Sequence, residues 1–192
     1  MTDPAPPAVT ALPDEDLMLL VARGVVREPA AELFRRHNRA LFNYLAWLAR
    51  GDLKEAEDIA QNAWMRVLSR CGDYTPSAAF RSFLFTIARN LWLDDKRSAW
   101  QRTCVDEEAA PEAGDDGDLS PEAELQLRQN SQRVHAALLA LPVNQREAVA
   151  LRFFAGMSVD DIAATVGVGF ETVKSRLRYA FRQLRTELER AP

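Results

Sequence analysis

The chain has 192 residues, of which 47% are hydrophobic and 27% charged, and its formal net charge is −4. This composition is typical of a globular protein of one large or two small domains, and no run reaches the roughly 18 apolar residues that a membrane helix needs. Because the N-terminus also lacks a basic segment followed by an apolar one, we expect a cytoplasmic protein with reduced cysteines.

Apolar residues recur at helical spacing along most of the chain, and no run alternates as a strand would, so the expected fold class is all-α. Charge divides the chain into three parts. Residues 1–104 carry 14 basic and 13 acidic side chains, and residues 105–120 carry no basic and 7 acidic side chains. Residues 121–192 carry 10 basic and 8 acidic side chains. An acidic segment rich in Pro and Gly is typical of a flexible linker, which here would join two small helical domains.

These features predict a disordered tail at residues 1–13, a first domain at 14–103, the acidic linker at 104–121 and a second domain at 122–192. In the first domain, Asp14 or Asp16 is expected to cap a short helix that breaks near Gly24. Pro29 in a first-turn position then favours a long helix over about residues 30–50. Its buried side is expected to consist of Leu33, Phe34, His37, Leu41, Tyr44, Leu45 and Leu48.

The next helix is expected over DLKEAEDIAQNAWMRVLSR, which begins at Asp52. Helical spacing predicts one buried stripe, made of Ala56, Ile59, Ala60, Ala63 and Val67. The opposite face carries four polar or flexible side chains: Asp58, Gln61, Asn62 and Met65. Such a face is either solvated or a docking surface for a protein, because amides and Met adapt to a partner, and spacing alone favours the solvated alternative.

A helix over FRSFLFTIARNLWLDDKRSAWQR combines aromatic and basic residues. We expect Phe83, Leu84, Ile87, Ala88 and Leu91 to face inward, and Phe85, Arg89, Trp92, Leu93, Lys96 and Trp100 to point away. Rings interleaved with cations on an exposed helix face suit single-stranded nucleic acid, because bases stack on the rings while the cations follow the backbone. An equally good alternative is that Trp92 and Trp100 pack against the first helix or a partner.

In the second domain, one helix is expected to end at Leu141-Pro142 and another to run from Gln145 to Phe154, with Val149 and Phe153 turned toward the rest of that domain. Ser158 and Asp161 then form the pattern of a capping box. This cap starts a short helix with an inner stripe of Val159, Ile162, Ala163 and Val166.

Gly167 can end that short helix in the left-handed region, and the turn Gly167-Val168-Gly169 leads into another helix. The inner side of this last helix is expected to be Val173, Leu177, Ala180, Phe181 and Leu184. The two helices predict a helix-turn-helix, whose second member can enter a DNA major groove.

The outer side of that last helix is rich in cations and hydroxyls: Glu171, Lys174, Ser175, Arg178, Tyr179 and Arg182. From Phe170 to Arg185 the chain has five basic residues and one acidic residue. Such a surface suits phosphates and base edges. The alternative is the solvated basic face of an ordinary amphipathic helix.

Enzymatic chemistry is not indicated. The chain offers two isolated histidines, two separated cysteines and no Gly-rich phosphate loop. The adjacent acids Asp94 and Asp95 diverge by about 100° on a helix, so they cannot converge on one substrate atom. We therefore expect no catalytic residues, no metal and no cofactor.

Three segments, AEDIAQNAWMRV, FRSFLFTIARNLWLDDKR and LPVNQREAVALRFFAGMSVDDIAATVGVGFETVKSRLRYA, occur in the order found in the sigma factors of bacterial RNA polymerase. The chain from Leu17 to Leu188 resembles the extracytoplasmic-function (ECF) group of the sigma-70 family, which keeps only regions 2 and 4. The resemblance implies a non-catalytic protein that binds core RNA polymerase and directs promoter-specific initiation. It would recognise minus-35 and minus-10 elements in promoter DNA and assist promoter melting, with an anti-sigma factor as a further expected partner.

The resemblance also assigns residues by position. The surface for core polymerase is assigned to Asp58, Gln61, Asn62 and Met65. This assignment reverses the preference for a solvated face. The minus-10 DNA is assigned to Phe85, Arg89, Asn90, Lys96 and Arg97, and a flipped-out base to the loop 73–79. The minus-35 DNA is assigned to Thr172, Lys174, Ser175, Arg176, Arg178 and Tyr179. The acidic linker would thread toward the active-site and RNA-exit channels of the polymerase.

Three positions depart from the family pattern: Phe83 stands where Trp is usual, Asn62 where an acid is commoner, and Glu171 where Gly is frequent. Glu171 would face DNA, which weakens any expectation about the minus-35 sequence. Two other functions remain open. One is a free-standing helix-turn-helix regulator that binds a palindrome as a dimer, and the other is a sigma-like decoy that binds an anti-sigma factor without polymerase.

Overall fold

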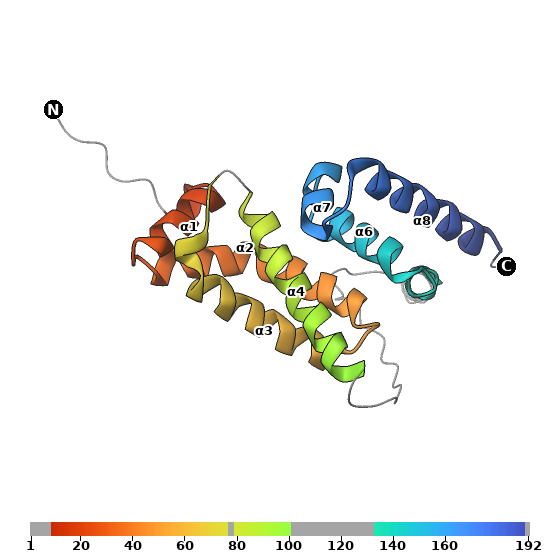
Figure 1. Ribbon diagram of the computed structural model, residues 1–192, viewed down its shortest axis with the longest axis horizontal. Helices are drawn as coiled ribbons and strands as arrows, with labels where there is room; N and C mark the ends of the chain where they lie inside the picture. Colours follow the sequence, from red (N-terminus) through yellow and green to blue (C-terminus); the bar gives the residue numbers. More distant parts are fainter. Residues whose placement is uncertain (1–8, 77–78, 101–132, 191–192) are drawn as a thin grey trace, which may run out of the picture.

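The computed structural model describes residues 9–76, 79–100 and 133–190. Within these ranges every regular element is a helix, so the expected all-α fold class is confirmed (Figure 1). The helices form two lobes, which we call the N-terminal lobe (residues 9–100) and the C-terminal lobe (residues 133–190). The predicted linker, residues 104–121, lies outside the described residues.

The N-terminal lobe is a bundle of four α-helices with two short 3₁₀ helices. They are η1 (Val9–Ala11), α1 (Asp14–Ala22), α2 (Arg27–Leu48), α3 (Leu53–Ser69), η2 (Cys71–Asp73) and α4 (Phe80–Trp100). The helix α2 packs against α1 and α3, and α3 packs against α4. As expected, the helical conformation is interrupted between α1 and α2 at Gly24, where φ is +92°.

Neither Asp14 nor Asp16 caps α1, contrary to the sequence prediction. The N-cap position is Pro13, without any side-chain hydrogen bond. The Asp14 carboxylate instead accepts a hydrogen bond from Arg36 Nη1 at 2.8 Å and lies 2.6 Å from His37 Nε2. Burial alone would raise the pKa of Asp14, but the hydrogen bond from Arg36 and the charge of His37 outweigh it and lower this pKa. The carboxylate therefore joins α1 to α2.

Residues 9–13 belong to the N-terminal lobe, although the sequence placed them in a disordered tail. They include η1, and two carbonyl groups in this stretch accept hydrogen bonds from Arg36. Arg36 Nη2 lies 2.7 Å from the carbonyl oxygen of Thr10, and Arg36 Nη1 lies 2.8 Å from that of Leu12. One guanidinium group thus orders the segment before α1.

The buried stripe predicted for α3 is confirmed, because Ala56, Ile59, Ala60, Ala63 and Val67 are all buried. On α2 the prediction fails for Phe34, which is 47% exposed. The Phe34 ring lies at the edge of the bundle, 5.3 Å between centroids from the ring of Trp64. Trp64 itself is buried, and its Nε1 donates to Asn38 Oδ1 at 3.0 Å, which fixes α3 against α2.

The C-terminal lobe contains the predicted helix-turn-helix. Residues 133–139 are helical, and they precede α6 (Val143–Phe153), α7 (Val159–Val166) and α8 (Phe170–Arg190). The capping box is present: Ser158 Oγ accepts from the Asp161 amide at 3.1 Å, while the Asp161 carboxylate accepts from the Ser158 amide at 3.1 Å. Gly167 ends α7 in the left-handed region with φ of +70°.

Two aromatic residues of the C-terminal lobe are more exposed than expected. Phe153 is 64% exposed and Phe181 is 43% exposed, although both were predicted to face the inside of the domain. Their rings contact each other edge-on with centroids 6.0 Å apart. They therefore form a contact between α6 and α8 at the surface of the lobe, while the smaller Val173, Leu177 and Ala180 fill the space beneath α8.

The two lobes share one apolar core. Buried residues of α2 and α4 belong to the same cluster as buried residues of α6, α7 and α8. The helix α6 packs against α2, and α7 packs against α4 (Figure 1). No helix within the described ranges combines the length and apolarity that crossing a membrane requires.

Candidate nucleic-acid interface

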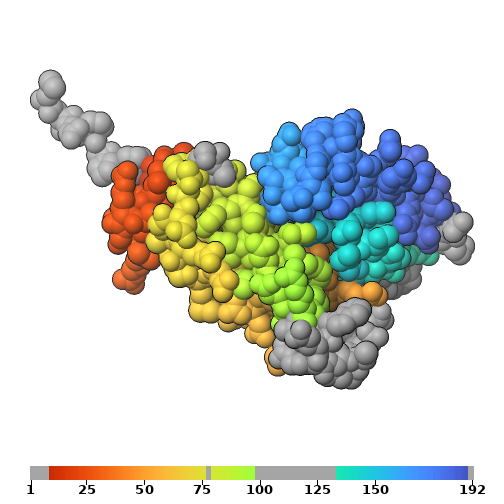
Figure 2. Space-filling view, viewed as in Figure 1, coloured from red at the N-terminus to blue at the C-terminus, as the bar shows by residue number. Residues whose placement is uncertain are grey.

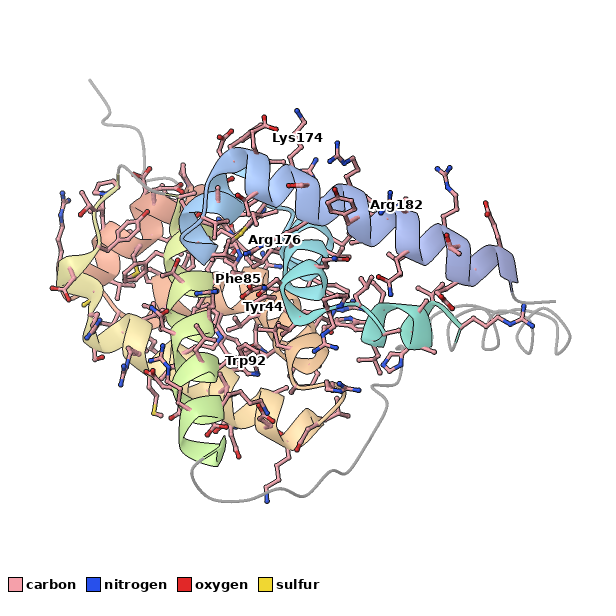
Figure 3. All side chains as sticks on the ribbon, turned by 45° about the vertical axis from the view of Figure 1, so that its right-hand side comes forward. Tyr44, Phe85, Trp92, Lys174, Arg176 and Arg182 are labelled. Carbon is pink, nitrogen blue, oxygen red and sulfur yellow. The ribbon has the colours of Figure 1, made fainter. Side chains whose placement is uncertain are left out.

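The outer side of α8 carries most of the residues predicted to read the major groove. Thr172, Lys174, Arg178 and Tyr179 are exposed, whereas Ser175 and Arg176 are half-buried. Ser175 Oγ donates to the carbonyl oxygen of Glu171 at 2.6 Å, so its hydroxyl proton is used within the helix. Figure 3 shows Lys174 and Arg182 on the outer side of α8 and Arg176 on the side that faces the other helices.

Aromatic rings support the cations of α8. The Arg178 and Arg182 guanidinium carbons lie 5.2 and 4.9 Å from the centre of the Tyr179 ring, and Lys174 Nζ lies 5.9 Å from the Phe170 ring centre. Such contacts attract a cation to the face of a ring. Lys174 is also 3.6 Å from Glu171, an exposed pair that contributes little in water. The basic face is therefore partly ordered before any ligand binds.

The helix α4 differs from its prediction on the side expected to point away from the core. Phe85 is completely buried and Trp92 is 8% exposed. The Phe85 ring contacts the Tyr44 ring of α2 edge-on, with centroids 5.2 Å apart, and the two lie side by side between α4 and α6 (Figure 3). The predicted outward orientation is wrong for Phe85 because α4 packs on two sides, against α3 and against the C-terminal lobe. For Trp92, whose orientation the sequence left open, burial agrees with the packed alternative. Phe85 is therefore a core residue.

The basic residues predicted on α4 are in different environments. Arg97 is exposed and lies 3.4 Å from Asp94, and Asn90 is exposed. Lys96 Nζ is 2.8 Å from Glu55 Oε2 of α3. Arg89 is mostly buried.

The Arg89 side chain binds an acid of the other lobe. Its Nε donates to Glu147 Oε1 of α6 at 2.7 Å. Tyr44 Oη also lies 3.4 Å from this carboxylate oxygen. Burial, followed by the negative charge of Glu147, raises the pKa of Tyr44 well above its ordinary value, so the Tyr44 hydroxyl stays protonated. The sequence did not predict this contact, because no pattern around Glu147 indicates a partner in the other lobe.

The four residues predicted to bind a protein partner share one exposed surface of α3. We call Asp58, Gln61, Asn62 and Met65 the α3 outer face, and all four are exposed, Met65 by 62%. A large exposed apolar side chain among polar groups is common where a protein docks. Gln61 Nε2 makes only a long hydrogen bond of 3.4 Å to Glu57 on the same helix. The main helix contacts of α3 are with α2 and α4 of its own lobe.

A small pocket lies where the two lobes meet, beside the start of α4. Its lining comes from both lobes and consists of Asp14, Glu15, Ala79, Arg81, Ser82, Met157 and Asp161. Ala79 ends the loop predicted to hold a flipped-out base, and part of that loop, residues 77–78, is outside the described ranges. Among the described residues, no group of three or more His, Cys, Asp or Glu side chains is arranged to hold a metal ion.

Comparison with known protein families identifies both lobes. The family "Sigma-70 region 2" matches residues 33–102, and the family "Sigma-70, region 4" matches residues 137–186. These matches cover most of α2 and all of α3 and α4 in the first lobe, and α6, α7 and most of α8 in the second. They lie within the two predicted domains.

Curated relatives extend the likeness over most of the chain. The ECF RNA polymerase sigma factor SigL of Mycobacterium tuberculosis is 32% identical over 163 residues, which are 82% of this chain and 87% of SigL. The ECF RNA polymerase sigma factor SigE of Mycolicibacterium smegmatis is 35% identical over 160 residues, which are 82% of this chain and 60% of SigE.

Solved structures agree on the fold. The sigma factor RpoE in complex with the anti-sigma factor NepR from Bartonella quintana has a TM-score of 0.66 at 24% identity, and covers 93% of this chain and 98% of RpoE. CnrH in complex with the cytosolic domain of CnrY has a TM-score of 0.68 at 23% identity, and covers 93% of this chain and 99% of CnrH. With both domain families in order and a relative at 32% identity over nearly its whole length, the chain belongs to the ECF RNA polymerase sigma factors of the sigma-70 family.

Proposed function

We propose that this chain binds core RNA polymerase through the α3 outer face and directs it to promoters through α8 and α4. The observation that carries the proposal is the presence of two separate exposed surfaces of different chemistry. The α3 outer face is polar with one exposed Met, whereas α8 presents cations. The first suits a protein and the second suits DNA.

The minus-35 element is assigned to the first turns of α8. Lys174 and Arg178 can meet phosphates or guanine edges, and Tyr179 holds the Arg178 guanidinium over its ring. Thr172, Ser175 and Arg176 lie in the same N-terminal half of α8, with Arg176 half-buried on the side that faces the other helices. Glu171 is exposed beside these cations, where a carboxylate can accept a hydrogen bond from a cytosine amine.

The minus-10 element is assigned to α4, with a smaller set of residues than the sequence predicted. Asn90, Lys96 and Arg97 are exposed, and Lys96 Nζ is paired with Glu55. Arg89 completes the set when its pairing with Glu147 is released. Phe85 is omitted because it is fully buried against Tyr44. The cations would follow the backbone of a separated strand.

Regulation by an anti-sigma factor is part of the proposal, because the solved relatives RpoE and CnrH are described in complexes, RpoE with the anti-sigma factor NepR. The chain would act in the cytoplasm, where the polymerase is. The polymerase would perform the chemistry of RNA synthesis, and this chain would contribute promoter specificity only.

In vitro transcription tests the proposal. The purified chain would be added to bacterial core polymerase on fragmented genomic DNA of its host, and RNA start sites would be mapped. We expect discrete new starts that share two upstream sequence elements and that are absent with core polymerase alone. Tight core binding without any start would support a decoy, and binding to palindromic DNA without core binding would support a free-standing regulator.

A further inference from the structure

A row of three exposed cations runs along the outer side of α8. Lys174, Arg178 and Arg182 follow one another at four-residue steps, so they lie on one ridge of the helix. Figure 3 shows Lys174 and Arg182 on this side. Figure 2 shows the blue surface of α8 at the edge of the molecule, where the N-terminal lobe does not cover it in this view. The row is therefore open to a ligand that approaches the C-terminal lobe.

The resemblance to sigma factors assigns Lys174 and Arg178 to DNA but gives Arg182 no role. The Arg182 guanidinium carbon lies 4.9 Å from the centre of the Tyr179 ring, and that of Arg178 lies 5.2 Å from the same centre. Within the described ranges, neither guanidinium group forms an ion pair or a hydrogen bond. Two like charges that share one ring repel each other, and an anion beside them would relieve this repulsion.

A hollow of about 300 Å³ lies beside the Arg182 side chain. Its lining consists of Gln145, Tyr179, Arg182, Gln183, Thr186 and Glu187. The Thr186 hydroxyl donates to the Arg182 carbonyl oxygen at 3.0 Å, and Gln183 Nε2 donates to the carbonyl oxygen of Ala140 at 3.5 Å. Arg182 is thus the cation of this lining. Because Glu187 would repel an anion, the end of the hollow beside Tyr179 is the place for one.

Position along the helix axis decides what each cation of the row can reach. An α-helix rises about 1.5 Å per residue, so Arg178 lies about 6 Å and Arg182 about 12 Å beyond Lys174. The major groove is about 8.5 Å deep. When the first turns of α8 meet the base edges, Arg178 is within the groove, whereas Arg182 is at the level of the sugar-phosphate backbone that borders it. Arg182 therefore suits a phosphate and not a base.

We infer that Arg182 binds a backbone phosphate of the duplex beside the minus-35 element, at the end of the hollow next to Tyr179. The inference rests on the proposed function, because it takes α8 as the helix that enters the groove. A guanidinium group binds a phosphate by charge-assisted hydrogen bonds. Because all base pairs carry the same phosphates, this contact adds affinity and salt sensitivity without selecting a sequence. The Tyr179 ring holds the guanidinium group in place before DNA arrives.

Salt-dependent DNA binding by the holoenzyme tests this assignment. The probe is a fluorescein-labelled duplex that carries a minus-35 element mapped by the transcription assay and ends before the minus-10 element. A second probe has the minus-35 element scrambled. Fluorescence anisotropy at several KCl concentrations would give the affinity of the wild-type and Arg182→Gln holoenzymes. The variant should bind both duplexes about fivefold less tightly at low salt, and its slope of log affinity against log salt should be shallower by about 1.

Two further variants of α8 are matched controls. Arg178→Gln should reduce the preference for the mapped over the scrambled duplex, a preference that Arg182→Gln should leave unchanged. Arg185→Gln removes an equal charge about 16 Å beyond Lys174, further out than the bordering backbone, and should keep the wild-type slope. All three arginine side chains are exposed, so helical circular dichroism and affinity for core polymerase should not change.

Three results would overturn the inference. An unchanged salt slope in Arg182→Gln would mean that this side chain binds no phosphate, and an altered preference between the two duplexes would mean that it reads a base. An equally shallow slope in Arg185→Gln would mean that only the net charge of α8 matters.

Failure of the proposed function gives a different result. If no minus-35 element can be mapped, or if Arg178→Gln leaves the preference between the duplexes unchanged, α8 does not read the groove, and the assignment of Arg182 fails with it. If the element is mapped and Arg178→Gln lowers the preference while Arg182→Gln keeps the wild-type slope, only the inference about Arg182 fails.

Discussion

The Arg182 guanidinium carbon lies 4.9 Å from the centre of the Tyr179 ring, so an aromatic side chain supports a cation one turn further along α8. Tyr179 does the same for Arg178. Replacing Tyr179 with Leu removes both contacts, each of which contributes about 0.5–1 kcal/mol when exposed. We expect Tyr179→Leu to weaken binding of the holoenzyme to promoter DNA by about fivefold or more, measured by fluorescence anisotropy.

Tyr179→Phe is the matched control for this prediction. It keeps the ring beneath both guanidinium groups and removes only the hydroxyl, so its affinity should stay within about twofold of wild type. An equal loss in both variants would mean that the hydroxyl, and not the ring, is the group that matters.

Arg178→Ala should reduce promoter-specific transcription by about fivefold or more and leave affinity for core polymerase nearly unchanged, because a cation at a base edge or phosphate acts on DNA only. Arg185→Ala is a suitable comparison. It removes the same charge from the same helix two turns further on, and should have a smaller effect. Loss of core binding in the Arg178→Ala chain would contradict the assignment of α8 to DNA.

The double substitution Asp58→Ala with Gln61→Ala should lower the affinity for core polymerase by about tenfold, since both side chains lie on the exposed α3 outer face. Native gel titration of core with labelled chain would measure it. Glu189→Ala, which removes one exposed acid from the other lobe, should leave that affinity unaltered. Unchanged core affinity in the double variant would refute the docking assignment.

Gly167→Ala should destabilise the helix-turn-helix by about 1–2 kcal/mol, because Gly167 has φ of +70°, a conformation that disfavours a Cβ atom. Gly169 lies two residues further on, its φ is outside the positive range, and a Cβ atom there would meet nothing within 4 Å. Gly169→Ala should therefore have little effect on the urea midpoint. Similar midpoints for both variants would argue against the left-handed turn.

Stability should depend on Glu32 in the acid range. Hydrogen bonds from Arg35 and then Arg36 lower the pKa of Glu32 from its ordinary 4.5 to about 2. Because the folded-state pKa is depressed, this stabilisation is present above about pH 4.5 and is lost as the pH falls toward 2. In urea unfolding, Glu32→Gln should be less stable than wild type at pH 6, and the difference should shrink at pH 3.

The exposed acid Glu28, on the same helix, provides the comparison for this pH dependence. Glu28→Gln should differ little from wild type at either pH. If the difference in unfolding free energy between Glu32→Gln and wild type did not change with pH, the contacts with Arg35 and Arg36 would not lower the pKa of Glu32.

Local signals in the sequence were enough to predict the elements that depend on local chemistry. The Ser158 and Asp161 pair and Gly167 specify where α7 begins and ends by hydrogen bonds within a few residues. The α3 stripe was predictable because its residues follow one helical spacing, although that spacing omitted Trp64, which is also buried. The same helical spacing predicted that the α3 outer face is exposed, as the structure has it.

The errors on α4 arise from contacts between distant parts of the chain. A helical stripe defines one buried side, but α4 packs on two, so Phe85 and Trp92 are buried where one-sided spacing predicts exposure. Glu147 lies 58 positions from Arg89, and neither residue has a local pattern that announces its partner. For the same reason the sequence suggested two independent domains, and not lobes in contact.

The apolar core continues from α2 and α4 into α6 and α7 without interruption. Two modules joined only by a tether would melt separately, whereas modules that bury each other's side chains lose stability together. With the lobes in contact, heating should therefore produce a single calorimetric transition for the whole molecule. A protease that cleaves the tether should leave two fragments that stay associated, because the cohesion of the lobes resides in this shared interior.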